Sequence, residues 1–287
     1  MVREDVTEWI DLRQKLRLDF TKCSRYPTPL RLGVFAITLL LLWLPLAGPI
    51  YWFWGAGNNI SIVTILILYG EFIVLLRLWG QRVHQQTQPL KNHGLVINRK
   101  NGLDLFKGII IGLLSLLCLF LFEGGLGWLN WQSPTQFLPK VMLEGLIVAL
   151  GVGLAEELMF RGWLVDELQW DYGSKASVWL SSTLYALLHF VKPFAEVWRT
   201  SPSFPGLLLL GLTLGWTRIV RKGRLGFPIG LHAGLVWGYY VTNVGDLVLY
   251  TGQVPVWVTG IDRNPLAGSM GLLFLGLMAL GLRRVPI

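Results

Sequence analysis

The sequence predicts an all-α, polytopic membrane protein with about eight transmembrane helices. Hydrophobic residues make up 53% of the chain and charged residues only 15%, whereas about a quarter of a soluble domain is charged. The apolar residues gather in runs close to the ~20 residues that cross a bilayer. Alternating ten-residue segments, which are typical of outer-membrane barrels, are absent. This pattern excludes a disordered chain and an ordinary soluble globule, and two cysteines exclude a disulfide scaffold.

Each apolar run supports one expected helix. The first run follows a charged tail without a small-residue cleavage site, so we expect it to remain as an anchor. The fourth run continues as helix past the membrane surface until Gly173, which is a stop signal. The eight expected spans are 32–53, 61–79, 104–123, 137–163, 175–191, 204–220, 226–245 and 267–284.

These spans suggest four regions. We expect a cytoplasmic N-terminal tail at 1–31, N-terminal transmembrane helices at 32–136, a core at 137–245, and an outer loop with a last transmembrane helix at 246–287. Within the tail, residues 5–20 have apolar side chains at helical spacing. Either a short helix on the membrane surface or a solvated tail would explain that spacing.

The positive charges predict the orientation. If the N-terminus is inside, all but four of the 25 Lys and Arg also fall inside, which is the positive-inside pattern. Both termini are therefore expected in the cytoplasm. The net charge of +8 is then a topology signal, so we expect the lipid bilayer as a partner and no nucleic acid.

Ionisable residues inside the spans are the strongest signal of function, because each is costly there. Glu71 and Glu144 could be hydrogen-bonded to neighbouring helices, and Glu123 is expected in water near the outer end of its span. Adjacent Glu156 and Glu157 inside an apolar helix are harder to explain by packing.

Glu157 and Arg161 are four residues apart, so a helix places them on one face as an ion pair. Glu156 points about 100° away from Glu157. It is left partly desolvated beside a like charge, which suits a general base. A buried charge cluster that only locks helices together is the structural alternative.

Two histidines are expected at the depth of Glu156. Glu156 lies 17 residues before Gly173 and His189 lies 16 after it, so an antiparallel hairpin would bring them level. His232 lies eight residues after Arg224, at a similar depth below the inner surface. Three costly groups on three spans could therefore converge near the cytoplasmic side.

These residues resemble the CPBP family, the CAAX proteases and bacteriocin-processing enzymes, also called the Abi family. Its Glu-Glu-x-x-x-Arg motif is present as Glu156, Glu157 and Arg161. The resemblance covers about residues 137–244, and the layout of eight spans is compatible with it. The first motif together with two correctly ordered histidines is fairly specific, whereas any single motif is not.

The two histidine motifs depart from the family pattern. Phe-x-x-x-His reads Tyr185 to His189, which keeps an aromatic ring. His-x-x-x-Asn or Asp begins at His232 but ends at Val236, which cannot donate a hydrogen bond. Asn243 is too far along the helix to replace the amide, and Tyr239 or Tyr240 could help from the next turns.

The resemblance implies an intramembrane endopeptidase of the glutamic type. Glu156 and His189 would activate a water, and His232 would help stabilise the oxyanion. Glu157, Arg161 and Tyr185 would support the site. The implied substrate is a membrane-anchored or lipid-modified protein or peptide, cut at a site that opens toward the cytoplasm, and no cofactor is required.

Three other hypotheses stay open. Glu156, His189 and His232 offer a carboxylate and two imidazoles, a possible zinc set for a metal-dependent peptidase. Val236 favours a non-proteolytic membrane scaffold or protein-stabilising factor that keeps the buried network for structure. A proton-coupled transporter ranks last, because no inverted repeat or interrupted helix pair is visible.

Overall fold

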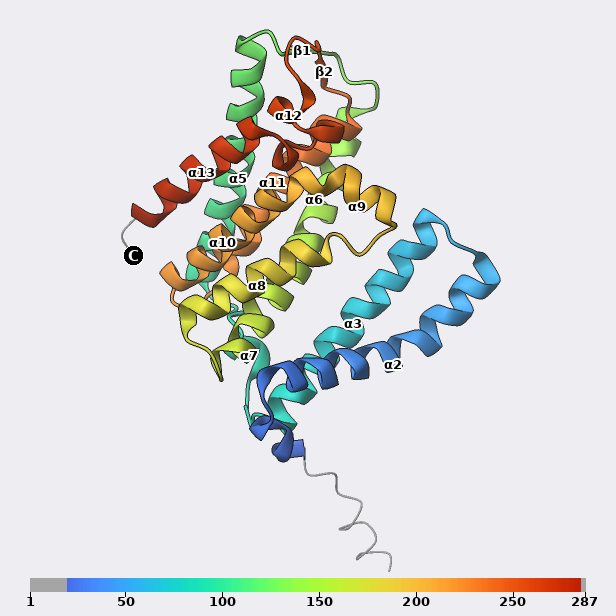
Figure 1. Ribbon diagram of the computed structural model, residues 1–287, viewed down its shortest axis with the longest axis vertical. Helices are drawn as coiled ribbons and strands as arrows, with labels where there is room; N and C mark the ends of the chain where they lie inside the picture. Colours follow the sequence, from blue (N-terminus) through green and yellow to red (C-terminus); the bar gives the residue numbers. More distant parts are fainter. Residues whose placement is uncertain (1–19, 285–287) are drawn as a thin grey trace, which may run out of the picture. The chain divides into compact units, whose positions relative to one another are not determined.

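The computed structural model describes residues 20–284, and the helical class is confirmed there (Figure 1). Each of the eight apolar runs lies in a helical segment. Within the described residues, five helical segments are long and apolar enough to cross a membrane. The count of eight spans and the orientation therefore stay predictions. The five segments are Thr28–Trp54, Asn58–Arg82, Arg99–Gly125, Leu138–Gln169 and Phe194–Val220.

The chain divides into two compact units, Met1–Pro89 and Leu90–Ile287. The expectation for residues 5–20 lies almost wholly outside the described residues. In the first unit, α2 (Thr28–Trp54) and α3 (Asn58–Arg82) pack on each other. The indole Nε1 of Trp43 donates to the backbone oxygen of Thr64 at 2.8 Å, which joins the two helices.

The second unit holds the remaining long helices and two short strands. The fourth apolar run of the chain lies in this unit and forms one continuous helical segment. The π-helix η2 interrupts the regular α-helix of that segment. The elements of this run are α6 (Leu138–Glu156), η2 (Glu157–Leu164) and α7 (Val165–Gln169). The other long helices are α5 (Arg99–Gly125), α8 (Ser174–Leu188), α10 (Phe204–Val220), α11 (Gly226–Val244) and α13 (Ser269–Arg284).

Shorter elements connect the helices. They are η1 (Phe20–Arg25), α4 (Pro89–Asn92), β1 (Leu129–Trp131), α9 (Phe194–Thr200), η3 (Ser201–Ser203), β2 (Val248–Tyr250), α12 (Val256–Thr259), η4 (Ile261–Arg263) and η5 (Pro265–Ala267).

Helix α11 lies at the centre of this unit, with α5 and α6 as its most extensive partners (Figure 1). Gly108 and Gly112 of α5 face Gly230 and Gly234 of α11. A Cβ atom on Gly230 would lie 2.0 Å from the backbone oxygen of Leu105, so only glycine allows this approach. Small residues commonly bring helices close in membranes, where packing and not the hydrophobic effect drives association.

The π-helix η2 is supported by α8. In a π-helix the backbone bonds run from i to i+5, and such turns are rare and often functional. The hydroxyl of Ser181 on α8 donates to the backbone oxygen of Phe160 within η2 at 2.8 Å. This bond fixes α8 against the segment that carries Glu157 and Arg161.

One end of the second unit is held by a buried cluster of charge. The Asp166 carboxylate accepts from the Arg218 guanidinium at 2.8 Å and bonds to Nδ1 of His93 at 2.8 Å. Asp104 of α5 pairs with Arg224, just before α11, at 2.8 Å. These pairs join α7 to α10 and α5 to α11. In the expected orientation they lie on the cytoplasmic side.

The opposite end carries a two-stranded antiparallel sheet of β1 and β2, where sequence analysis gave no strand. Glu123, at the end of α5, is fully buried, so the expectation that it lies in water is wrong. The hydroxyl of Tyr250 on β2 donates to its carboxylate at 3.3 Å. Burial and the nearby Glu123 carboxyl raise the pKa of Tyr250, so the phenol stays protonated and can donate. The sheet thus covers the end of the span.

Candidate active site

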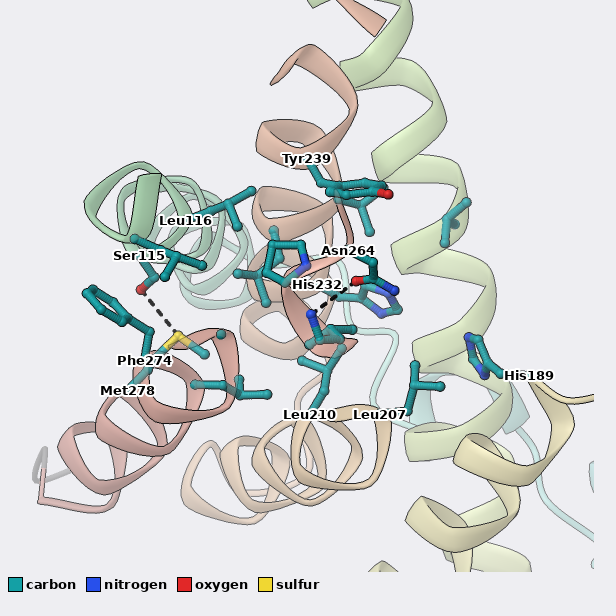
Figure 2. A pocket seen from close by; sticks show the side chains of 18 of the residues that line it. Ser115, Leu116, His189, Leu207, Leu210, His232, Tyr239, Asn264, Phe274 and Met278 are labelled. Carbon is teal, nitrogen blue, oxygen red and sulfur yellow. Dashed lines mark hydrogen bonds between the residues drawn. The ribbon is translucent and has the colours of Figure 1, made fainter. Parts of the chain in front are cut away.

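A cavity of about 290 Å³ lies within the second unit, and its lining is mostly apolar (Figure 2). Glu156 from α6, His189 from the end of α8 and His232 from α11 all line it. The structure therefore places the three expected catalytic side chains around one space. Their catalytic roles remain predictions.

The Glu157 carboxylate is the centre of a buried network. Its Oε1 accepts from Nη1 of Arg161 at 2.9 Å and is 2.8 Å from Nδ1 of His232. Glu157 and Arg161 are almost fully enclosed, with side-chain exposures of 0% and 1%. A buried charge is tolerated when it is paired and hydrogen-bonded. Glu157 is therefore both the partner of Arg161 and the group that orients His232.

This contact assigns the nitrogens of His232. A carboxylate paired with arginine can only accept, so Nδ1 of His232 carries the hydrogen. The other nitrogen, Nε2, points to Glu156, with 3.8 Å between Nε2 and Oε2 of that residue. Both ring nitrogens of His232 thus face carboxylates.

Glu156 is the last residue of α6, at the point where the π-helix begins. Its side chain is 20% exposed, which makes it the more open of the two adjacent glutamates. Its Oε2 is buried and has no hydrogen-bond partner. A carboxylate oxygen without a partner can accept a proton from a water in the cavity.

His189 completes the polar wall. It follows the last residue of α8, and its Nδ1 bonds to the backbone oxygen of Tyr185 at 2.8 Å. Since a carbonyl oxygen only accepts, Nδ1 carries the hydrogen and Nε2 is left as an acceptor. An acceptor in this position could orient a water beside Glu156.

Tyr185 connects the network to the two histidines. The Arg161 guanidinium lies 4.3 Å from the centre of its ring, within the range of a cation–π contact. The Tyr185 and His189 ring centres are 4.6 Å apart in an edge-on arrangement. The Tyr185 hydroxyl interacts with the Glu156 carboxyl. The tyrosine therefore keeps the ring expected at this motif position and adds a polar contact to Glu156.

Val236 also lines the cavity, one helical turn after His232, so the wall is apolar where the family motif has Asn or Asp. Of the suggested replacements, Tyr239 reaches the cavity. Asn243 does not line it, and its amide donates to the backbone oxygen of Tyr239 at 3.0 Å. Asn264 lines the cavity from a loop before α13, and no motif in the sequence indicated it.

The described residues contain no group of three or more His, Cys, Asp or Glu side chains placed to hold a metal ion. The possible zinc set of Glu156, His189 and His232 is therefore not assembled in this arrangement.

Comparison with known proteins places these features in a family. Residues 138–238 match the family described as Type II CAAX prenyl endopeptidase Rce1-like. No curated protein and no solved structure gives a significant match. The matched segment runs from the start of α6 to Gly238 and contains all three motifs. With its long apolar helices, the chain is an integral membrane protein, and residues 138–238 form a domain of CAAX protease type, similar to the CPBP family that the motifs indicated.

Proposed function

We propose that the protein is an intramembrane endopeptidase that hydrolyses a peptide bond of a membrane-associated or lipid-modified protein. The observation that carries this proposal is the shared cavity. A free, buried carboxylate oxygen of Glu156 lies there with two histidines whose hydrogen positions are fixed by their partners. The apolar remainder of the lining suits an apolar substrate segment.

In the proposed reaction, a water lies between Glu156 and Nε2 of His189. Glu156 takes a proton from the water while the water oxygen attacks the peptide carbonyl carbon. In this proposal His232 also carries a hydrogen on Nε2 and donates it in a hydrogen bond to the resulting oxyanion. The intermediate then collapses with cleavage of the C–N bond, and the Glu156 carboxyl returns the proton to the leaving amine. The products are a carboxylic acid and an amine, which become a carboxylate and an ammonium ion when the acid passes its proton to the amine, and no other reactant is needed.

The decisive variant is Glu156→Gln, which keeps the size of the side chain but removes the base. Loss of a general base lowers rates by about 100- to 10,000-fold. We expect protein termini produced by the wild type in cell membranes to disappear in this variant. The measurement is a comparison of membrane-protein termini between cells carrying each form, after deletion of their own copy.

Glu144→Gln is the matched control, because Glu144 lies on the same helix but is half exposed and 3.7 Å from Lys140. This variant should leave the termini unchanged. Activity in isolated membranes should also survive a strong chelator, whereas the zinc hypothesis requires its loss.

A non-proteolytic scaffold is the second candidate, and Val236 in the cavity wall favours it. Under that function, Glu156→Gln would leave both the termini and the cellular phenotype of the wild type in place. This result would end the protease proposal.

A further inference from the structure

Val236 leaves the cavity without the amide expected one turn after His232, yet another amide enters the same cavity. We propose that Asn264 supplies the missing donor, with its Nδ2–H bonded to the oxyanion of the tetrahedral intermediate. Asn264 lies outside the matched segment 138–238, in a loop between η4 and η5. The inference rests on the proposed peptidase function and adds a catalytic residue to it.

The orientation of the Asn264 amide follows from its backbone partner. Its Oδ1 accepts from the backbone N–H of Leu266 at 3.0 Å, so the side chain caps η5. An N–H donor requires an acceptor, which places the oxygen on this side and Nδ2 on the other. Among the described residues, Nδ2 has no hydrogen-bond partner. Figure 2 shows Asn264 between Tyr239 and His232.

The loop that carries Asn264 is held firmly. Gly260 has φ 115°, and a Cβ atom there would lie 2.0 Å from the backbone oxygen of Asn264. Asp262 is bonded to Arg199 and Arg263 to Asp246, so ion pairs tie the loop to α9 and to the residues before β2. A donor fixed before the reaction needs no reorganisation when charge develops, which is what an oxyanion site requires.

Other polar groups in the cavity are less suited to this role. The Ser115 hydroxyl already donates to the sulfur of Met278 at 3.3 Å. The Tyr239 ring is seven residues after His232, about 10 Å along the helix. Asn264 thus offers an oriented donor in the cavity that His232 also lines.

The test separates capping of η5 from hydrogen-bond donation. Asn264→Asp keeps an oxygen for the Leu266 N–H but lacks the NH₂ group, whereas Asn264→Ala loses both. Full-length protein is expressed in cells lacking their own copy, and the readout is the initial rate at which Glu156-dependent termini appear. Removing one oxyanion donor costs about 100- to 1,000-fold. We expect the rate of both variants to fall by about 100-fold, with protein level and melting temperature unchanged in Asn264→Asp, which keeps the cap.

Two further variants sharpen the result. Glu144→Gln is the control and should stay within about twofold of the wild type, because Glu144 is half exposed and does not line the cavity. Val236→Asn places an amide at the family position. We therefore expect the double variant Val236→Asn, Asn264→Ala to cleave at least tenfold faster than Asn264→Ala alone.

Two outcomes would overturn the inference and remain distinguishable. If Asn264→Asp cleaves at the wild-type rate while Glu156→Gln does not cleave, Asn264 is only a cap, and the peptidase function stands. If the wild type produces no Glu156-dependent termini at all, the peptidase function fails and the role of Asn264 fails with it.

Discussion

At the residue scale, Glu156 and Glu157 are neighbours in sequence but have different surroundings. Glu157 has 0% side-chain exposure and shares one oxygen between Arg161 and His232. Glu156 is 20% exposed and lines the cavity, where its Oε2 has no hydrogen-bond partner. A carboxylate held by an arginine and a histidine fixes geometry, whereas one that faces the cavity can accept a proton from a water. The local environment thus divides two identical side chains into a positioning group and a proposed base.

The Glu157 network predicts a separable effect on stability and activity. Glu157→Gln leaves Arg161 buried without its counter-charge, and breaking such a pair costs about 3–5 kcal/mol. Arg161→Gln should cost a similar amount, because Glu157 is then unpaired except for His232. The double variant should be more stable than either single one, since no lone charge remains. Denaturation in detergent measures all three.

Activity should follow a different order. The double variant also loses the carboxylate that holds Nδ1 of His232. We therefore expect it to recover stability but not cleavage. Recovery of both would show that Glu157 has no positioning role.

At the element scale, the contact between α5 and α11 sets the position of His232. Gly230 is two residues before it, and a side chain there would meet the backbone of α5. Backbone atoms cannot move aside as a flexible side chain can, so the helices must separate.

Gly230→Ala should therefore destabilise the protein by about 1–3 kcal/mol, the usual cost of overpacking. Gly276→Ala on α13 is the matched control, because no atom lies within 4 Å of a Cβ atom there. The control should be neutral or slightly stabilising, since alanine favours a helix over glycine. Unfolding midpoints in detergent measure both, and equal midpoints would contradict the role of the glycine contact.

The sequence predicted the helices well because a membrane demands long apolar runs. It did not predict the π-helix η2, whose support includes a hydroxyl from Ser181 on another helix. It also misplaced Glu123 in water, since the covering Tyr250 is 127 residues away in the chain. The sequence also did not predict that Asn264 lines the cavity, because only tertiary packing brings this loop residue there.

At the scale of the whole molecule, the distribution of Lys and Arg remains the basis for orientation. Both termini are expected in the cytoplasm, with the β1–β2 end outside. A fluorescent reporter at the C-terminus should fold and emit, and a reporter active only outside the cytoplasm should work when inserted at exposed Gly252. The reverse pattern would invert the topology and move the proposed opening of the cavity to the other face.

The glycine contact between α5 and α11 also determines which part of the chain must stay together for the fold to form. The family match covers α6 to Gly238, but α5 lies outside it and still forms the most extensive contact of α11. Gene fusion or recombination that moved residues 138–238 alone would leave a glycine-rich helix face against lipid, where it loses its close backbone partner. A fragment that keeps the packing of α11 must therefore be longer than the matched segment and must include α5.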